Sequence, residues 1–246
     1  MLFSQYVNIL RFYPGLGGII RKTVRIVALA CWLVFVLSFF ASAGPLPDTG
    51  QTKCYDDLGN EIACPNPLER FHGQDANYTI NPPTYTKLDA QGNGLIDSSS
   101  SWVMVRDNVT GLIWEVKTND GSIHDALNTY TWYNSDPQTN AGEAGTPGEG
   151  TDTEDFIQAL NDSYFGGFSD WRIPTLKELT AVVNYQQYNP SISAVYFPNT
   201  KTSNYWSATT YADNVNYAYY VMFNFGSDSF YSKSSSYHVR AVRGGP

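Results

Sequence analysis

The stretch 165-FGGFSDWRIPTLKEL-179 contains a turn, a short strand and the start of a helix, and this combination decides the fold class that we expect. Thr175, followed three residues later by Glu178, has the pattern of a capping box, so a helix is predicted over 175-TLKELTAVVNY-185. Leu176, Leu179 and Val183 lie on one face of that helix. Ahead of it, the Gly pair predicts a turn that leads into a short strand.

A second helix is predicted just upstream, over 151-TDTEDFIQALN-161. Thr151 and Glu154 repeat the capping pattern, and the apolar stripe consists of Phe156, Ile157 and Leu160. The segment before it, 134-NSDPQTNAGEAGTPGEG-150, is rich in Gly, Pro and acidic residues without any hydrophobic period. We predict a mobile loop there.

Strands are predicted on both sides of this helical pair. Apolar residues alternate on either side of DNVTG in 101-SWVMVRDNVTGLIWEVK-117, which indicates a β-hairpin with Trp102 and Trp114 as core anchors. After Tyr188 the alternation is again of the β type, up to 238-HVRAVRGGP-246. The order β, helix, helix, β predicts an α+β fold in which the N-terminal and C-terminal strands pair.

Residues 213–238, DNVNYAYYVMFNFGSDSFYSKSSSYH, draw 20 of their 26 positions from Asn, Asp, Ser, Tyr, Phe and His. Alternation predicts that one set of side chains points inward (Val221, Phe223, Phe225) and another outward (Tyr220, Met222, Asn224). After Gly226 there is no period, which predicts a loop and sheet edge with aromatic side chains on its surface. Such a mixture is typical of antibody paratopes, although solvated low-complexity strands have it too.

The first 43 residues have the features of an export signal. Four basic residues and no acidic ones precede the apolar run IVALACWLVFVLSFF, which ASAG follows. This pattern predicts a signal peptide over 1–43 that is cleaved after Ala43; an uncleaved N-terminal membrane anchor is the alternative. The remaining chain has 11 Lys and Arg against 23 Asp and Glu, a formal net charge of −12, which disfavours nucleic acid and other polyanionic partners.

Residues 44–100 are predicted to be a loop-rich segment, followed by the main domain over 101–246. Cys54 and Cys64 flank the turn DLGN, and in an exported protein such a pair predicts a disulfide; a metal site is the alternative. Asp89 opens a stretch that resembles a calcium loop, but Ser100 stands where a bidentate Glu is needed. We therefore expect an ordinary turn there, and no metal or cofactor.

Four ordered motifs give the chain a family resemblance: 107-DNVTGLIWEVK-117, 165-FGGFSDWRIPTLKEL-179, 205-YWSATTY-211 and 239-VRAVRGG-245. Over about residues 46 to 245 the sequence resembles the bacterial Lcl C-terminal-domain-like family, named for a collagen-like adhesin. The resemblance implies a variant of the C-type lectin fold with two helices and a small antiparallel sheet. Residues 205–245 also resemble the variable regions of proteins that diversity-generating retroelements mutate at adenines. Asparagine-type codons mutated there yield the six residue types above, but not Met222 or Lys233.

Catalysis is not expected. The helix start WRIPTLKEL also resembles formylglycine-generating enzymes, but their copper-holding cysteine pair has no counterpart after Cys64. No Ser stands in a nucleophile elbow, and a surface loop explains His124 beside Asp125. A hydrolase that uses the loop 120–136 remains an alternative, which would gain if Asp120, His124 and Asp125 converged in a deep pocket.

The sequence thus predicts a secreted, periplasmic or cell-surface bacterial protein that binds a ligand, as an adhesin or receptor-binding protein does. Its partner would be a protein or carbohydrate on a cell or phage surface, and a structural role in a surface or fimbrial assembly is the alternative. Trp206, Phe223, Arg240 and Val242 would form the framework. The predicted contact residues are Tyr217, Tyr219, Tyr220, Asn224, Ser227, Asp228, Phe230, Tyr231, Ser232, Ser234, Ser236 and Tyr237.

Overall fold

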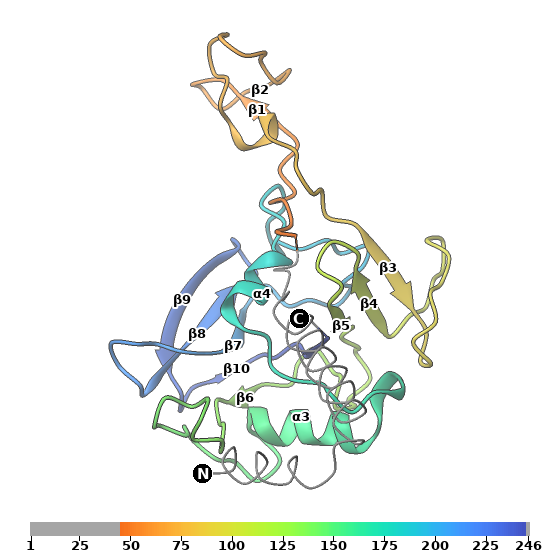
Figure 1. Ribbon diagram of the computed structural model, residues 1–246, viewed down its shortest axis with the longest axis vertical. Helices are drawn as coiled ribbons and strands as arrows, with labels where there is room; N and C mark the ends of the chain where they lie inside the picture. The colour runs from red at the N-terminus through yellow and green to blue at the C-terminus, as the bar shows by residue number, and fades with distance from the viewer. Residues whose placement is uncertain (1–44, 245–246) are drawn as a thin grey trace, which may run out of the picture. The chain divides into compact units, whose positions relative to one another are not determined.

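The computed structural model describes residues 45–244 (Figure 1). The predicted signal peptide or anchor, residues 1–43, lies outside the described residues. Within residues 45–244, no helix is both long and apolar enough to span a bilayer. The described chain combines two α-helices with several small antiparallel sheets, which confirms the mixed α+β class.

One antiparallel sheet brings the two ends of the main domain together. Its order is β11–β5–β4–β3, from β3 (Tyr85–Leu88), β4 (Met104–Asp107), β5 (Ile113–Glu115) and β11 (Val242–Arg243). The predicted hairpin is confirmed, and Asp107 closes its turn by accepting hydrogen bonds from the Val109 N–H and the Thr110 hydroxyl. The C-terminal strand pairs with this hairpin, as expected. Because β3 pairs with β4, the sheet spans the predicted boundary at residue 100.

Both predicted helices are present, with small differences at their ends. α4 (Leu176–Ala181) begins after a complete capping box of Thr175 and Glu178, but it ends four residues earlier than predicted. α3 (Thr153–Asp162) begins two residues later than the predicted range, because its N-cap is displaced by one residue from Thr151. Its N-cap is Asp152, whose carboxylate accepts the backbone N–H groups of Glu154 and Asp155. Short 3₁₀ turns, η1 (Asp75–Asn77) and η2 (Phe165–Gly167), complete the helical elements.

The segment 213–238 differs from its prediction. A second sheet of order β7–β8–β9 is made of β7 (Asn204–Thr210), β8 (Tyr217–Met222) and β9 (Ser227–Ser232). The prediction of a loop after Gly226 is therefore wrong, because these residues pair one for one with β8. β9 is the outer strand of this sheet (Figure 1), so the predicted sheet edge is correct.

Two smaller strand pairs complete the sheets. β1 (Cys54–Tyr55) and β2 (Glu61–Ile62) form a hairpin that the Cys54–Cys64 disulfide closes, which confirms the predicted bridge. β6 (Tyr130–Thr131) pairs with β10 (Ser236–Tyr237). At Asp89 the side chain accepts the N–H groups of Gln91 and Asn93, the arrangement of an ordinary turn.

The core consists of two apolar clusters, and the predicted framework residues Trp206, Phe223 and Val242 are fully buried within them. Arg240 is equally buried and donates to the Glu115 carbonyl oxygen at 2.6 Å and to the Thr200 hydroxyl at 2.7 Å. Trp114 is buried as predicted, whereas Trp102 lies at the margin of the core. Truncating any of these fully buried aromatic side chains should be costly, because native cores leave few voids.

The loop 134–150 is not the free loop that its composition suggested. Its backbone folds back on itself, since the Asn134 N–H donates to the Ala144 carbonyl and the Thr146 N–H to the Trp132 carbonyl. Asn140 is buried, and its side chain donates to the Asn134 carbonyl at 3.1 Å. The structure therefore corrects the prediction: long-range contacts, which composition does not reveal, attach this loop to the domain.

Candidate ligand-binding surface

The register of the β7–β8–β9 sheet divides the segment 213–238 between two faces. Directly paired residues in an antiparallel sheet point to the same side, and neighbours along a strand point to opposite sides. The first face therefore consists of Tyr217, Tyr219 and Val221 with Asp228, Phe230 and Ser232. The second face consists of Ala218, Tyr220 and Met222 with Ser227, Ser229 and Tyr231.

Four rings gather at the outer end of the first face: Tyr211, Tyr217, Tyr219 and Phe230. Tyr211 stacks on Phe230 with 3.8 Å between ring centroids and 5° between the ring planes. Tyr219 lies edge-on to both, at 5.6 Å from Tyr211 and 5.9 Å from Phe230. Phe230 is 39% exposed, so this aromatic cluster reaches the surface. Tyr211 is not among the predicted contact residues, although it is the last residue of the YWSATTY motif.

Polar groups border the aromatic cluster. The Tyr211 hydroxyl donates to Asp213 Oδ2 at 3.0 Å, and this hydrogen bond raises the pKa of Tyr211. Asn214 organises the adjacent turn by accepting the Asn216 N–H through its side chain at 3.1 Å. Apolar ring faces beside amide and carboxylate groups can recognise a ligand by shape and by hydrogen bonds together.

The second face is anchored in the core. Tyr220 is only 8% exposed and lies against Trp206 and Tyr237, with ring centroids 6.1 and 5.0 Å away. The prediction that Tyr220 points outward is therefore wrong. The cause is that the inner part of β8 lies between the two core clusters: Tyr220 belongs to one of them, and its neighbour Val221, on the opposite face, belongs to the other. Tyr231 on this face is exposed, and Tyr237 is half-buried between it and Trp206.

Of the predicted residues Asn224, Ser227 and Asp228, the first lies in the β8–β9 turn and the other two begin β9. Ser227 and Asp228 are exposed, and Asn224 is half-buried. Phe225 is 68% exposed, which corrects its predicted inward position, because β8 ends at Met222 and the alternation stops there. Asp228 also borders a hollow of about 440 Å³ between α4 and the N-terminal residues 46–49, where Leu176, Val183 and Tyr185 supply apolar walls.

Ser232 ends β9, Ser234 lies in the turn after it, and Ser236 begins β10; a buried lysine lies between Ser232 and Ser234. The Lys233 side chain is 2% exposed, with Nζ 2.6 Å from the Glu143 carbonyl oxygen and 3.4 Å from that of Asn140. Nζ also lies 3.9 Å from the ring centroid of Trp132. Burial lowers the pKa of Lys233 to about 8. Lys233 thus attaches the loop 134–150 to the end of β9.

The framework, hairpin and helix caps described above all fall within one family profile. The profile of the Lcl C-terminal domain matches residues 103–243. The chain belongs to the Lcl C-terminal domain family. No curated protein matches the sequence. The Lcl C-terminal domain of this chain includes α3, α4 and the whole β7–β8–β9 sheet, so every predicted contact residue lies inside it.

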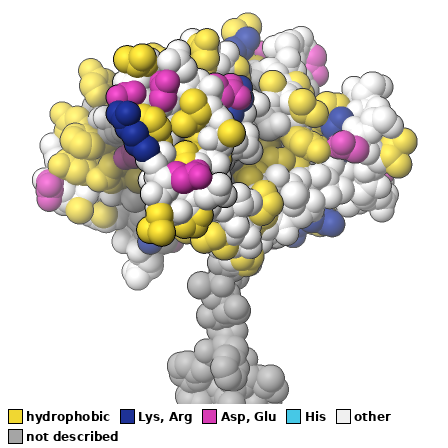
Figure 2. All heavy atoms as spheres, turned by 90° about the horizontal axis from the view of Figure 1, so that it is seen from above, with side chains coloured by type: hydrophobic (Ala, Val, Ile, Leu, Met, Phe, Trp, Pro, Cys, Tyr) yellow, Lys and Arg dark blue, Asp and Glu magenta, His cyan; other side chains and the backbone are white. Residues whose placement is uncertain are grey.

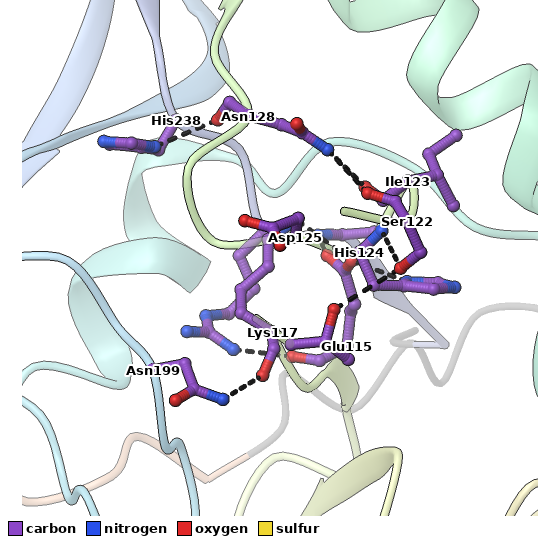
Figure 3. Close-up of polar contacts among 12 residues, drawn as sticks. Glu115, Lys117, Ser122, Ile123, His124, Asp125, Asn128, Asn199 and His238 are labelled. Carbon is purple, nitrogen blue, oxygen red and sulfur yellow. Dashed lines mark hydrogen bonds and ion pairs between the residues drawn. The ribbon is translucent and has the colours of Figure 1, made fainter. Parts of the chain in front are cut away.

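A buried charged cluster lies elsewhere in the Lcl C-terminal domain (Figure 3). The carboxylate of Glu115 on β5 is fully buried, and its Oε1 lies 3.0 Å from Lys117 Nζ and 2.9 Å from His124 Nδ1. Oε2 accepts the Ala241 N–H at 3.1 Å. Burial acts to raise the pKa of Glu115, but Lys117 and His124 more than offset it and hold that pKa below its usual value. Each carboxylate oxygen therefore has a partner.

The neighbouring acids hold the loop 118–128 in shape. Asp120 accepts the Thr118 hydroxyl at 2.6 Å, and Asp125 accepts the backbone N–H groups of Gly121 and Leu127. A hollow of about 400 Å³ lies nearby, but its walls include Asn128, Tyr130 and Asp155 and none of the candidate catalytic residues Asp120, His124 and Asp125. This hollow is therefore not the deep pocket that a hydrolase using those three residues would need.

Proposed function

We propose that this chain is an exported, non-catalytic binding protein whose C-type-lectin-like domain holds its ligand on the β8–β9 hairpin and the turns around it. The aromatic cluster of Tyr211, Tyr217, Tyr219 and Phe230 supplies contact area with few rotatable bonds. Tyr231 and the serines of the turn 232–236 supply a second contact region. The ligand is a protein or carbohydrate on a cell or phage surface.

One observation carries this proposal: within 213–238, the exposed positions combine aromatic rings with small polar residues. The exposed positions hold Asn, Asp, Ser, Phe and Tyr at every place but Val215; they are Asp213, Asn214, Val215, Asn216, Phe225, Ser227, Asp228, Phe230, Tyr231, Ser234 and Ser236. A solvated strand needs only polar residues there, whereas a contact surface needs rings as well. The rings favour the contact surface.

The two residues that adenine mutation of asparagine-type codons cannot produce have structural tasks. Lys233 is buried and attaches the loop 134–150, and Met222 packs against the core cluster around Trp206. Diversification would leave such positions constant while it changes their exposed neighbours. Their placement supports the proposal that the segment is, or descends from, a retroelement-diversified surface. A template repeat that matches the DNA for residues 205–243 and differs only at adenines would test it.

The alternative of a structural subunit in a surface assembly predicts that the aromatic cluster is covered between copies. The binding experiment compares residues 44–246 with a variant that carries Tyr219→Ala, Phe230→Ala and Tyr231→Ala. A matched control carries Tyr78→Ala and Tyr188→Ala, which remove exposed rings outside the proposed surface. Immobilised proteins are exposed to cell-surface extracts and to a glycan array.

We expect the wild type and the control to bind the same partner, and the triple variant to lose it while it stays folded and its melting temperature falls by only a few degrees. Retention of the same partner by a folded triple variant would contradict the proposed surface. Equal loss in the control would mean that the capture reflects non-specific aromatic adhesion.

A further inference from the structure

The outer edge of β9 is open. β9 pairs with β8 through six consecutive residue pairs without a bulge, and no other described strand pairs with its far side (Figure 1). Its sequence SDSFYS contains no Pro or Lys, and Asp228 is its single charged residue. Natural proteins usually guard such edges with Lys, Pro, bulges or covering segments, because a free edge can pair with another strand.

One contact shows which β9 residues direct their backbone N–H and C=O groups toward β8 and which direct them outward. The Lys233 N–H donates to the Asn216 carbonyl oxygen at 2.9 Å, and this direction alternates along an antiparallel strand. Ser229 and Tyr231 therefore bond to β8, whereas Asp228, Phe230 and Ser232 direct their N–H and C=O groups outward. Ser235 donates to the Ser232 carbonyl oxygen; no other backbone bond to these three residues from outside the sheet is found in the described chain.

The strand is complementary to itself in one register. Outward-bonding residues must face one another across a new antiparallel pair. A two-fold axis at Phe230 places Phe230 opposite its own copy and Asp228 opposite Ser232, so all three outward residues are used. The Ser232 carbonyl oxygen, which accepts the Ser235 N–H, has a second lone pair for this contact. A two-fold axis at Asp228 would instead place two carboxylates opposite each other. An axis at Ser229 would pair Asp228 with Phe230 and leave Ser232 without a partner inside β9. The central register alone combines three bonding pairs with an aromatic pair and no opposed charges.

We propose that a second copy of this chain docks on β9, antiparallel and centred on Phe230, to form a continuous six-stranded sheet. The axis is perpendicular to the sheet, so the first faces of both copies lie on one side and their aromatic clusters adjoin. This contact is isologous and closed, which gives a dimer rather than a fibre. Since each mature chain carries a net charge of −12, the dimer should strengthen when salt screens the repulsion.

Site-specific cross-linking tests the register without any ligand. Residues 44–246 contain no other free cysteine if Cys54 and Cys64 remain bridged. Under mild oxidation, Phe230→Cys should form a covalent dimer, because residue 230 faces its own copy. The matched control Ser232→Cys, whose copy lies several residues away along the strand, should remain largely monomeric. Preferential cross-linking of Ser229→Cys, or equal yields at all three positions, would overturn the proposal.

Variants with opposite charges at residue 230 provide an independent test. Their mass is measured by sedimentation at rising protein concentration in about 0.15 M salt, where the screening length is about 8 Å. Wild-type protein should shift toward twice the monomer mass. Phe230→Lys and Phe230→Glu should each remain monomeric, and their equimolar mixture should dimerise again. A wild type that stays monomeric at every concentration, or a mixture that stays monomeric while both variants melt normally, would disprove the pairing. Neither assay requires ligand binding, so the proposed function can fail or hold separately.

Discussion

The two faces of the β7–β8–β9 sheet carry similar side chains but are supported differently. On the second face, rings extend from the buried Trp206 through Tyr220 and Tyr237 to the exposed Tyr231. On the first face, Val221 is covered by α4 and by the core cluster that contains Phe223 and Val242. The four-ring aromatic cluster lies outside this covered part. A tyrosine in this segment therefore either packs in the core or reaches the surface, and its position in the sheet decides which.

The largest effect is expected at the base of the second face. Trp206→Ala should lower the free energy of unfolding by about 3 to 5 kcal/mol, because it removes a fully buried indole and its hydrogen bond to the Tyr130 carbonyl. Chemical denaturation measures this loss. A reduction below about 1 kcal/mol, as at a surface position, would mean that the second face is not anchored in the core.

The pH dependence of stability tests how the buried Lys233 supports the turn that follows β9. Burial lowers the pKa of Lys233 from 10.5 to about 8, so between these values the unfolded chain binds more protons than the folded chain. The stability of the wild type relative to Lys233→Met should therefore rise as the pH increases from about 8 to 10.5. We expect a change on the order of 1 to 3 kcal/mol.

The measurement is urea unfolding of both proteins at three pH values, in which all other titrating groups cancel in the difference. Hydrogen exchange of residues 134–146 should be faster in Lys233→Met, since the two carbonyl contacts are lost. A difference in stability that does not depend on pH would show that Lys233 titrates as a solvated lysine.

The smallest effect is expected on the first face. Tyr219→Ala and Phe230→Ala should each change the free energy of unfolding by about 0.5 to 1 kcal/mol, close to the range for exposed positions and including one lost ring contact. Thermal melting of the single and double variants measures this. The double variant should lose slightly less than the sum of the single ones, because both single variants lose the same contact between Tyr219 and Phe230. A loss comparable to that of Trp206→Ala would mean that the aromatic cluster belongs to the core.

Much of the local structure could be read from the sequence. The capping box of Thr175 and Glu178, the DNVTG hairpin and the Cys54–Cys64 bridge were all predicted, because their determinants lie within ten residues of each other. The four-motif resemblance also indicated the family. Among the site residues, the exposure of Phe230 and Tyr231 followed from a segment rich in small polar residues.

Tertiary structure decided the rest. Tyr220 and Phe225 exchanged their predicted environments, because one of the core clusters covers Tyr220, whereas β8 ends at Met222 and its alternation does not extend to Phe225. The loop 134–150 is held by Lys233, 90 residues away from Glu143 in the sequence. The sequence by itself determined where helices, turns and the disulfide form, since these depend on neighbouring residues; only long-range packing decided which rings of 213–238 support the core and which reach the surface.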